Sequence, residues 1–453
     1  MTQDIVILAA GKGSRMKSAF SKVLHKIGGV AMVKRVLTTA KTLPDSQLHL
    51  VVGHQGEQVA AECQDFSANV VWQNDPQGTG DALRRVAPFL GKEGSTLTLY
   101  GDVPLIRAST LAKMTSLSTP NTLVLLTICL DNPTGYGRIV RNEQGAVTAI
   151  VEQKDATESQ LAITEVNTGI LLAPNVHLQT WLSSLTNNNA QGEYYLTDVI
   201  AMAARDGVDI VTVNPENEAE VAGVNDRVQL AALERELQHQ QAVHLMQNGA
   251  TLMDPARVDV RGELTTGCDV VIDVNCVFEG KVVLGDNVHI GPNCHLVNCT
   301  IGDNTVIKNN SLIEDSLVAE SCDIGPFARL RPGTQLAKKA KIGNFVETKK
   351  AIIGEGSKVN HLSYIGDTKM GANVNVGAGT ITCNYDGVNK YITQIDDNVF
   401  VGSNSSLVAP VHVSQGATIA AGSTITKQVG ENQLAFARAR QTHKDNWPRP
   451  TKK

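Results

Sequence analysis

A loop near the start of the chain has the residue types that hold a phosphate group. It reads Leu8-Ala9-Ala10-Gly11-Lys12-Gly13-Ser14-Arg15-Met16, and Lys22 follows shortly after it. Two glycines alone would also fit a plain turn after a strand. Here Gly11 and Gly13 let the backbone approach a ligand closely, while Arg15 and Lys22 can bind phosphate oxygens. The loop lacks the third glycine of a dinucleotide-binding fingerprint, and it also lacks the Gly-Lys-Ser/Thr of a Walker loop. The loop therefore predicts a phosphate site of another kind.

A carboxylate stands at the end of a later apolar segment. Asp102 follows Thr96–Tyr100 and a single glycine, Gly101. The end of a strand is a place from which a carboxylate can reach a cleft. Such a side chain can hold a divalent cation, but it can also cap a turn.

His361 is the single histidine of residues 329–387, a stretch that carries many polar residues. A neutral imidazole can accept a proton near pH 7. Arg331 and Lys349, in the same region, have the charge to bind a phosphate. Taken alone, a lone histidine is by default a surface residue, and isolated cations are by default solvated.

Apolar segments alternate with helical ones through the first half of the chain. This order predicts a mostly parallel, Rossmann-like α/β sheet that binds ligands at the carboxyl ends of its strands. Residues 226–248 predict a long connecting helix. We expect three parts: 1–225, a helical linker at 226–249, and 250–453. The expected strands are Asp4–Ala9, Leu48–Val52, Val70–Gln73, Thr96–Tyr100, Thr122–Leu130, Thr148–Glu152 and Ile210–Val213; the expected helices are 30–43, 55–62, 79–88, 109–118, 175–185 and 194–206.

An aliphatic or aromatic residue returns every sixth position through the second half. A period of six is the hexapeptide signature of a parallel β-helix, whereas an antiparallel sheet with spaced glycines would show no fixed interval of six. The segment Asn384–Ile395 breaks the period and predicts a protruding loop. The tail from 427 is irregular and basic. The runs are Ile272, Phe278, Leu284, Ile290, Leu296; Val318, Ile324, Leu330, Leu336, Ile342; Ile353, Val359, Ile365; and Val401, Leu407, Val413, Ile419, Ile425.

The composition excludes several classes of protein. With 42% hydrophobic and 19% charged residues, the 453-residue chain can build cores and is not a disordered protein. A net charge of −5 gives no general attraction to nucleic acid or to anionic membranes. No apolar run has membrane-spanning length, no secretory signal is recognisable, and the eight cysteines form no CxxC pair. We expect a cytoplasmic protein that binds neither nucleic acid nor membrane. His289 and His295 would share one face, but two histidines do not make a metal site.

The phosphate loop is part of a longer series of motifs. The chain continues with Gln73 and Gly78-Thr79-Gly80, Tyr100–Leu105, Gly135–Arg138, Glu152–Asp155, Glu165–Gly169 and Gly223–Asn225. Together with the hexapeptide repeat, this series resembles the bacterial bifunctional N-acetylglucosamine-1-phosphate uridyltransferase/glucosamine-1-phosphate N-acetyltransferases over almost the whole chain. The resemblance implies a nucleotidyltransferase domain, a connecting helix and a left-handed β-helix, whose hand the period alone does not establish.

For the first activity, the resemblance implies transfer of a uridylyl group from UTP to N-acetylglucosamine-1-phosphate. Arg15 and Lys22 would hold the triphosphate, and Asp102 and Asn225 would hold Mg²⁺. Gly137, Glu152 and Asn167 would bind the sugar, and Tyr100 and Gly101 would line the same site. The nucleotide would contact Leu8, Ala9, Ala10, Gly11, Gln73, Gly78 and Thr79. Many relatives have proline before the lysine, where this chain has Ser21; a freer backbone there predicts a modest kinetic effect.

For the second activity, the resemblance implies acetylation of glucosamine-1-phosphate by acetyl-CoA. His361 would be the general base, with Glu347 as an orienting partner. Arg331, Lys349, Tyr364, Asn375, Asn384 and Tyr385 would form the acceptor pocket. Ala378, Ser403, Ala421 and Arg438 would contact acetyl-CoA, because small side chains leave room for the pantetheine arm and a cation can meet a CoA phosphate.

The resemblance also implies a homotrimer with acetyltransfer sites built between neighbouring β-helices, and a product used for peptidoglycan and, in suitable bacteria, lipopolysaccharide. Two alternatives remain at this point. The β-helix could only regulate or oligomerise a monofunctional nucleotidyltransferase, or the chain could be a scaffold without activity.

Overall fold

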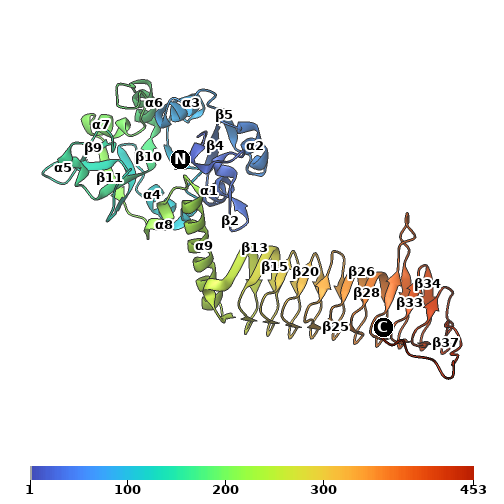
Figure 1. Ribbon diagram of the computed structural model, residues 1–453. Coiled ribbons are helices and arrows are strands. Elements are labelled where there is room, and N and C mark those ends of the chain that lie inside the picture. Colours follow the sequence, from blue (N-terminus) through green and yellow to red (C-terminus); the bar gives the residue numbers. More distant parts are fainter. Residues whose placement is uncertain (1–2, 453) are drawn as a thin grey trace. The chain divides into compact units, whose positions relative to one another are not determined.

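The computed structural model describes residues 3–452, which form two compact units divided between Leu237 and Gln238. Figure 1 shows an α/β unit built by the first half of the chain and a coiled β unit built by the second. Helix α9 (Arg227–Gln247) runs across the division. The expected domain boundaries at 225/226 and 249/250 remain a prediction.

A mixed sheet forms the centre of the first unit. β1 pairs in parallel with β4 and β6, and β4 with β5, while β7 and β11 form a second parallel pair. The order is β11 (Asp209–Val213), β7 (Thr122–Cys129), β10 (Glu165–Pro174), β6 (Ser95–Tyr100), β1 (Gln3–Ala9), β4 (Ser46–Val52) and β5 (Asn69–Trp72). The predicted, mostly parallel sheet is therefore confirmed.

Helices cover both faces of this sheet. Ile5, Ile7 and Ala9 of β1 pack in a core with α1, α2 and α4, whereas Val6 and Leu8 pack in a second core with α3, α6 and α7. Alternate residues of a strand face opposite sides, so β1 is buried on both. The helices are α1 (Met32–Ala40), α2 (Gly56–Glu62), α3 (Thr79–Val86), α4 (Ala108–Ser116), α5 (Glu158–Leu161), α6 (Asn175–Ser183), α7 (Asp198–Arg205) and α8 (Glu218–Val221).

The strand β10 was not predicted from the sequence; it lies between β6 and β7 and is antiparallel to both. Its pairing with β7 shifts register between Asn167 and Leu171, and Gly169 within it has φ of 87°. The irregularity hides the alternation by which a strand is recognised. β8 (Arg138–Arg141), which pairs with β10, was missed as well, while its partner β9 (Val147–Val151) matches an expected strand.

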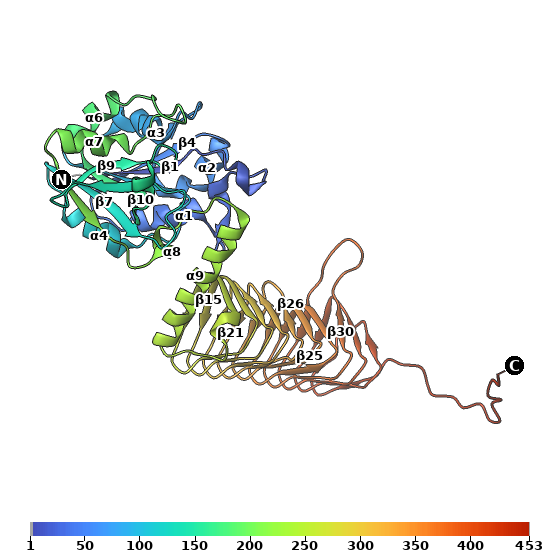
Figure 2. The same ribbon diagram turned by 60° about the vertical axis from the view of Figure 1, so that its left-hand side comes forward.

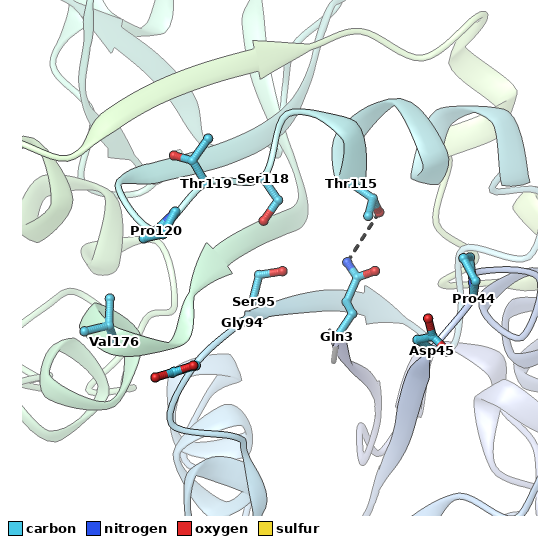
Figure 3. Close-up of a pocket in the computed structure, with 11 residues that line it drawn as sticks. Gln3, Pro44, Asp45, Gly94, Ser95, Thr115, Ser118, Thr119, Pro120 and Val176 are labelled. Carbon is cyan, nitrogen blue, oxygen red and sulfur yellow. Dashed lines mark hydrogen bonds between the residues drawn. The ribbon is translucent and has the colours of Figure 1, made fainter. Parts of the chain in front are cut away.

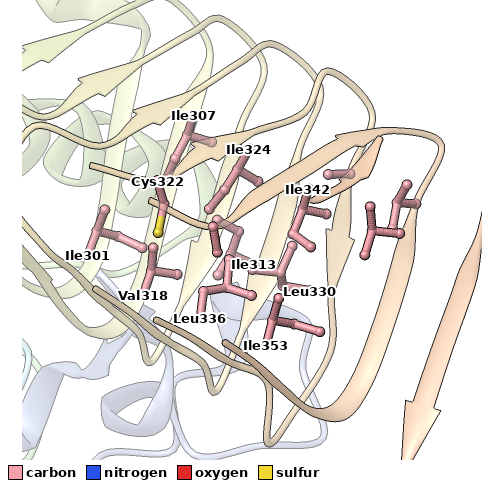
Figure 4. Packing of buried hydrophobic residues seen from close by; sticks show 14 of the residues in the cluster. Ile301, Ile307, Ile313, Val318, Cys322, Ile324, Leu330, Leu336, Ile342 and Ile353 are labelled. Carbon is pink, nitrogen blue, oxygen red and sulfur yellow. The ribbon is translucent and has the colours of Figure 1, made fainter. Parts of the chain in front are cut away.

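The second unit is a parallel β-helix whose coils have three faces (Figures 1 and 2). Ladder residues stack directly on the next coil, as Ile290 does on Ile307 and Ile307 on Ile324. All of the predicted ladder residues belong to one buried core and are at most 5% exposed. Figure 4 shows part of this core, with Ile307, Ile324 and Ile342 on one face of the coils and Ile301, Ile313, Leu330 and Ile353 on the other two. The hexapeptide prediction is confirmed.

Two hydrogen-bonded sheets make up the three faces, because β15 is long enough to join two of them. One sheet contains β12 (Thr251–Leu252), β14 (Val271–Ile272), β16 (His289–Ile290), β19 (Val306–Ile307), β22 (Asp323–Ile324), β25 (Lys341–Asn344), β27 (Lys358–His361), β29 (Asn375–Val376), β32 (Phe400–Val401), β35 (Thr418–Ile419) and β37 (Leu434–Ala435). The other contains β13 (Val258–Thr266), β15 (Cys276–Leu284), β17 (His295–Val297), β18 (Thr300–Ile301), β20 (Leu312–Glu314), β21 (Leu317–Val318), β23 (Arg329–Leu330), β24 (Gln335–Leu336), β26 (Glu347–Ile353), β28 (Tyr364–Met370), β30 (Ile381–Cys383), β31 (Thr393–Ile395), β33 (Ser406–Val408), β34 (Val411–Val413) and β36 (Thr424–Ile425).

One loop interrupts the coils between β30 and β31 and stands out in orange in Figure 1. An antiparallel bridge joins Tyr385 to Lys390 inside it. The expected loop Asn384–Ile395 was three residues too long, because Thr393–Ile395 forms β31. In the tail, Leu434–Ala435 adds the strand β37 before the chain becomes irregular, as Figure 2 shows. Within residues 3–452, no helix is long and apolar enough to cross a membrane.

Candidate active sites

Lys22, Asp102 and Asn225 meet at the carboxyl end of β6. Lys22 Nζ donates to Asp102 Oδ2 and, at 3.1 Å, to Asn225 Oδ1. A backbone bond from Val224 N to Asp102 O, 2.9 Å long, fixes the segment before Asn225 beside the strand end. The side-chain oxygens of Asp102 and Asn225 thus both contact one cationic group, the Lys22 ammonium. Mg²⁺ is commonly held by one or two protein oxygens together with substrate phosphates, so this donor pair fits that ion.

The glycine loop lies beside these residues because β1 and β6 are neighbours. Leu8 is paired with Tyr100, and Gly101 N donates to Leu8 O at 2.9 Å. Gly13 has φ of 59°, and a Cβ there would lie 2.5 Å from Lys22 Cβ, so only glycine fits. At Gly11 a Cβ would meet nothing within 4 Å, which leaves space for a ligand. Arg15 is exposed on the same loop.

Gln73, Gly78 and Thr79 lie together between β5 and α3. Gln73 Nε2 donates to Gly78 O at 3.2 Å and to Asp81 Oδ2 at 2.8 Å. Gly78 has φ of 109°, and a Cβ there would lie 2.6 Å from Tyr194 O. The Thr79 hydroxyl accepts a 3.3 Å hydrogen bond from Leu196 N. The Gly78–Gly80 turn is therefore packed against the segment that precedes α7.

Gly137, Glu152 and Asn167 also come together. Asn167 N donates to Gly137 O at 2.9 Å, and a Cβ on Gly137 would lie 3.4 Å from the Glu152 carboxylate. Burial raises the pKa of the Glu152 carboxyl, and Asp155 and Asp198 raise it further, whereas the hydrogen bond from Thr197 opposes them.

Tyr100 lies within reach of the charges of both Asp102 and Glu152, and so connects the two groups of residues described above. Its ring lies against Gly169, where a Cβ would be only 2.6 Å away. Burial raises the pKa of the Tyr100 hydroxyl, and the nearby charges of Asp102 and Glu152 add to the shift. The hydroxyl is therefore a neutral hydrogen-bonding group at physiological pH.

A separate cavity of about 550 Å³ opens at the opposite edge of the same sheet (Figure 3). It is lined by Gln3 and Ser95, the first residues of β1 and β6, and by the segment 115–120 after α4, where Gln3 Nε2 donates to Thr115 Oγ1 at 3.3 Å. Ligands of open α/β sheets bind at the carboxyl ends of the strands. None of the expected site residues lines this cavity.

In the second unit, His361 ends β27 and contacts the coil below it. Its Nδ1 lies 2.7 Å from Asn344 Oδ1, the last residue of β25. An amide oxygen accepts, so this contact places the proton on Nδ1 and leaves the Nε2 lone pair free. A recess of about 240 Å³ lies beside His361 and is lined also by Gly343, Asn344 and Asn360.

The expected partner of His361, Glu347, has another role. Its carboxylate accepts a 2.8 Å hydrogen bond from Arg331 Nη1. Asn344, one coil below His361, takes the orienting place that the sequence interpretation gave to Glu347. Glu347 stands on β26, on a different face from β27, so the expected contact with His361 is not made within one copy of the chain.

Arg331 and Lys349 lie in one cationic group with Lys390 from the protruding loop. The neighbouring Lys390 ammonium lowers the pKa of Lys349, and Arg331 adds to the effect. Asn384 Nδ2 donates to Asp367 Oδ2, which ties the base of the loop to β28. Tyr364 pairs with Glu347 in register, and Tyr385 is 58% exposed on the loop.

Ala378, Ser403 and Ala421 occupy one corner of successive coils. Asn404 N donates to Ala378 O at 2.7 Å, and Gly422 N donates to Ser403 O at 2.8 Å. Arg438 Nη1 donates to Ala421 O at 2.9 Å, so the tail returns to this column. Asn375 begins β29, directly above Lys358 of β27. The four residues expected to contact acetyl-CoA thus lie along one column of successive coils.

Three residues of these sites were not singled out from the sequence: Asp81, Asn344 and Lys390. Asp81 follows the Gly-Thr-Gly turn directly, and Asn344 stands shortly before Glu347 in the sequence. Their roles depend on contacts between segments far apart in sequence, which a pattern within one segment does not reveal. Lys390 lies in the predicted loop, where its charge was the available signal.

Fold and sites together define a nucleotidyltransferase unit joined to a hexapeptide-repeat transferase unit. A model of the MobA-like NTP transferase domain matches residues 5–140, one of the GMPPB C-terminal domain matches 260–342, and one of the hexapeptide repeat of succinyl-transferase matches 392–427. A solved nucleotidyl transferase from Methanothermobacter thermautotroptrophicus, 18% identical, covers 53% of this chain and 99% of its own with a TM-score of 0.39.

Full-length relatives identify the family. The bifunctional protein GlmU of Marinomonas sp. (strain MWYL1) is 87% identical over 453 residues, which is 100% of both chains. GlmU of Marinobacter nauticus is 59% identical over 448 residues and that of Cellvibrio japonicus 58% over 450 residues, each covering 99% of both chains. The chain belongs to the family of the bifunctional protein GlmU, which confirms the resemblance inferred from the motifs.

Proposed function

We propose that this chain makes UDP-N-acetylglucosamine in two consecutive reactions, one in each unit. The β-helix transfers an acetyl group from acetyl-CoA to glucosamine-1-phosphate. The α/β unit then joins the N-acetylglucosamine-1-phosphate to UTP and releases pyrophosphate. One observation carries the proposal: the residues assigned to each reaction gather within a single unit, around Lys22–Asp102–Asn225 and around His361–Asn344.

In uridylyl transfer, a phosphate oxygen of the sugar attacks the α-phosphate of UTP. Both reactants are anions, so the protein must neutralise charge and hold them in line. Lys22 and Arg15 supply positive charge beside the open glycine loop, and the group Gly137–Glu152–Asn167 holds the sugar. Asp102 and Asn225 are the residues that would hold Mg²⁺, which would neutralise phosphate charge when bound.

In acetyl transfer, the amine of glucosamine-1-phosphate attacks the thioester carbon and the thiol of CoA leaves. The amine must lose a proton, and His361 Nε2 can take it because Asn344 holds the ring through Nδ1. Arg331, Lys349 and Lys390 place three cations where the sugar phosphate would bind. Ala378, Ser403, Ala421 and Arg438 would bind acetyl-CoA along their column.

The finer assignments belong to the same proposal. We assign Mg²⁺ to the first site, a homotrimer to the assembly and the cytoplasm to the location. A β-helix exposes flat faces and strand edges that a neighbouring copy can cover. UTP and acetyl-CoA are cytoplasmic metabolites, and the product would supply peptidoglycan and lipopolysaccharide synthesis.

Two single substitutions in the full-length chain test the proposal. Asp102→Ala removes one of the two oxygen donors and should lower uridylyl transfer by about 10³-fold while acetyl transfer stays within twofold. His361→Ala removes the proton acceptor and should lower acetyl transfer by roughly 10²–10⁴-fold while uridylyl transfer is unchanged. Pyrophosphate release and the acetyl-CoA-dependent loss of free amine measure the two reactions.

The two alternatives predict other results. A nucleotidyltransferase with a merely regulatory β-helix would show no acetyl-CoA-dependent loss of amine above background. A scaffold would lose nothing on Asp102→Ala. Loss of both activities from either substitution, in a protein that keeps its melting temperature, would contradict two independent sites.

A further inference from the structure

The side-chain amide of Gln73 has both of its hydrogens in use. Nε2 donates to Asp81 Oδ2 at 2.8 Å and to Gly78 O at 3.2 Å. The nitrogen of a side-chain amide has two hydrogens to donate and does not accept hydrogen bonds. Within residues 3–452, no group donates to Gln73 Oε1, and this atom is not among those sealed from solvent. The oxygen is therefore the only atom of this amide left for a ligand.

Asp81 prevents the Gln73 amide from flipping, that is, from exchanging the positions of its oxygen and its nitrogen. It lies in the first turn of α3, is 2% exposed, and accepts from Arg84 Nη2 and Arg85 Nε, each at 3.1 Å. Burial alone would raise the pKa of the Asp81 carboxyl, but the hydrogen bonds from Gln73, Arg85 and Arg84 outweigh it and hold the pKa low. An ionised carboxylate only accepts, so a reversed Gln73 would set its oxygen against two acceptors.

We propose that Asp81 is a positioning residue that holds Gln73 as a hydrogen-bond acceptor and thereby selects uracil over cytosine. This inference rests on the proposed function, which assigns Gln73 to the uridine nucleotide. The ring nitrogen N3 carries a hydrogen in uracil and a lone pair in cytosine. A fixed acceptor bonds to the first and repels the second, and sites that hydrogen-bond a substrate reject analogues that lack the matching group.

A purely structural role of Asp81 gives a different expectation. If the carboxylate only anchored Arg84 and Arg85 on α3, its loss would disturb the turn for every nucleotide. UTP and CTP would then lose efficiency in equal proportion. The ratio of the two nucleotides therefore separates positioning of Gln73 from support of the helix.

The test is Asp81→Asn in the full-length protein, with kcat/KM measured for UTP and for CTP against N-acetylglucosamine-1-phosphate. An asparagine can present either a donor or an acceptor, so Gln73 becomes free to turn. The UTP:CTP preference should fall by about tenfold or more, mainly through a higher KM for UTP and a lower one for CTP. An unchanged preference overturns the inference.

Arg85→Gln is the matched control. It removes one partner of Asp81 and leaves the contact with Gln73, so the preference should stay within twofold of the wild type. If Asp81→Asn does not fold, as judged by its melting temperature, Asp81→Ser also offers a group that donates and accepts, and should relax the preference in the same way. A wild-type protein that makes no UDP-sugar would refute the proposed function instead, because the preference is then undefined.

Discussion

At the residue scale, Ser21 shows how a departure from the family pattern fits its surroundings. The residue is fully buried directly before Lys22, and its hydroxyl has no hydrogen-bond partner. Its φ is −53°, within the range that a proline ring imposes. Among residues 3–452, no backbone carbonyl accepts from Ser21 N. The backbone of the folded chain thus already has the conformation that proline would fix, and the main difference between serine and proline here lies in the unfolded chain.

Ser21→Pro should therefore stabilise the protein. The free energy of unfolding should rise by about 0.4–1 kcal/mol, because proline restricts the unfolded chain, and the buried hydroxyl is lost as well. Lys22 keeps its place, so we expect uridylyl transfer to change by less than about threefold. Calorimetry and initial rates measure the two effects.

Ser21→Ala separates the causes, because it removes the hydroxyl but does not fix φ. A gain in Ser21→Ala equal to that in Ser21→Pro would assign the stabilisation to the hydroxyl alone. A rate raised by several orders of magnitude in Ser21→Pro would show that the position of Lys22 limits the wild-type reaction.

The hydrogen-bond partner of His361 could not be predicted from the sequence. His361 was predicted as the general base from its imidazole and from the family motifs around it, and Glu347 was expected as its orienting partner. The actual contact, Asn344, depends on which residues stack on neighbouring coils. Asn344 lies 17 positions before His361 and is uncharged, so no local pattern in the sequence marked it as the partner.

At the scale of elements, a buried polar network ties the strands of the α/β unit together. Asp4 of β1 lies 3.0 Å from His49 Nε2 of β4, and accepts from Gly91 N and Asn175 Nδ2 at 3.0 and 3.2 Å. Burial alone would raise the pKa of the Asp4 carboxyl, but these hydrogen bonds outweigh it and lower the pKa below its ordinary value of 3.8. Four separate segments thus depend on one ionised side chain.

This network should make the α/β unit sensitive to acid. Because the folded pKa of Asp4 is lowered, its contribution to stability is present above about pH 4 and is lost as the pH falls through the folded pKa. Asp4→Asn should lower the unfolding free energy by about 1–3 kcal/mol at pH 7 and flatten its pH dependence below pH 4. Fluorescence of the buried Trp181 during denaturant unfolding reports on this unit.

Asp45→Asn provides the comparison, since Asp45 is exposed next to the same strands. It should leave both the stability and its acid slope unchanged. Equal slopes in the wild type and Asp4→Asn would contradict a native carboxylate that is held ionised by its neighbours.

Elements also differ in how well the sequence reveals them. The β-helix was predictable because an inward residue every sixth position is demanded by each coil independently, and the ladder repeats that demand many times. β10 has no such redundancy. Its register shift and the positive φ of Gly169 break the local pattern, and its place between β6 and β7 is decided by tertiary pairing.

At the scale of the whole molecule, the β-helix exposes a group of apolar side chains close to His361. Phe327 and Phe345 stack at 5.1 Å on neighbouring coils and are 46% and 55% exposed, and Leu362 beside His361 is 63% exposed. All three have positive φ, which is unusual for such residues. An exposed apolar group of this kind marks a contact surface, and a second copy of the chain in the proposed trimer would cover it.

Phe345→Lys should therefore weaken the assembly. Acetyl transfer should fall by about tenfold at low protein concentration and recover as the concentration rises, while uridylyl transfer does not change. Light scattering after gel filtration measures the oligomer alongside both activities. Met253→Lys, at an equally exposed apolar residue after β12, should leave both the oligomer and the activities unaltered. A concentration-independent loss of acetyl transfer would place Phe345 in the acceptor site instead.

The winding of the second unit limits how such a chain can change its length during evolution. Within one wall of β26, inward and outward residues alternate, as Ala351, Ile352 and Ile353 do, and each inward residue rests on those of adjacent turns. A single inserted residue in that wall would exchange inside for outside over the rest of the strand. Growth is therefore tolerated in two forms: a complete extra turn, or an outward excursion at a bend such as the one after Cys383. The length of this unit can vary between relatives in steps of whole turns, while its cross-section stays constant.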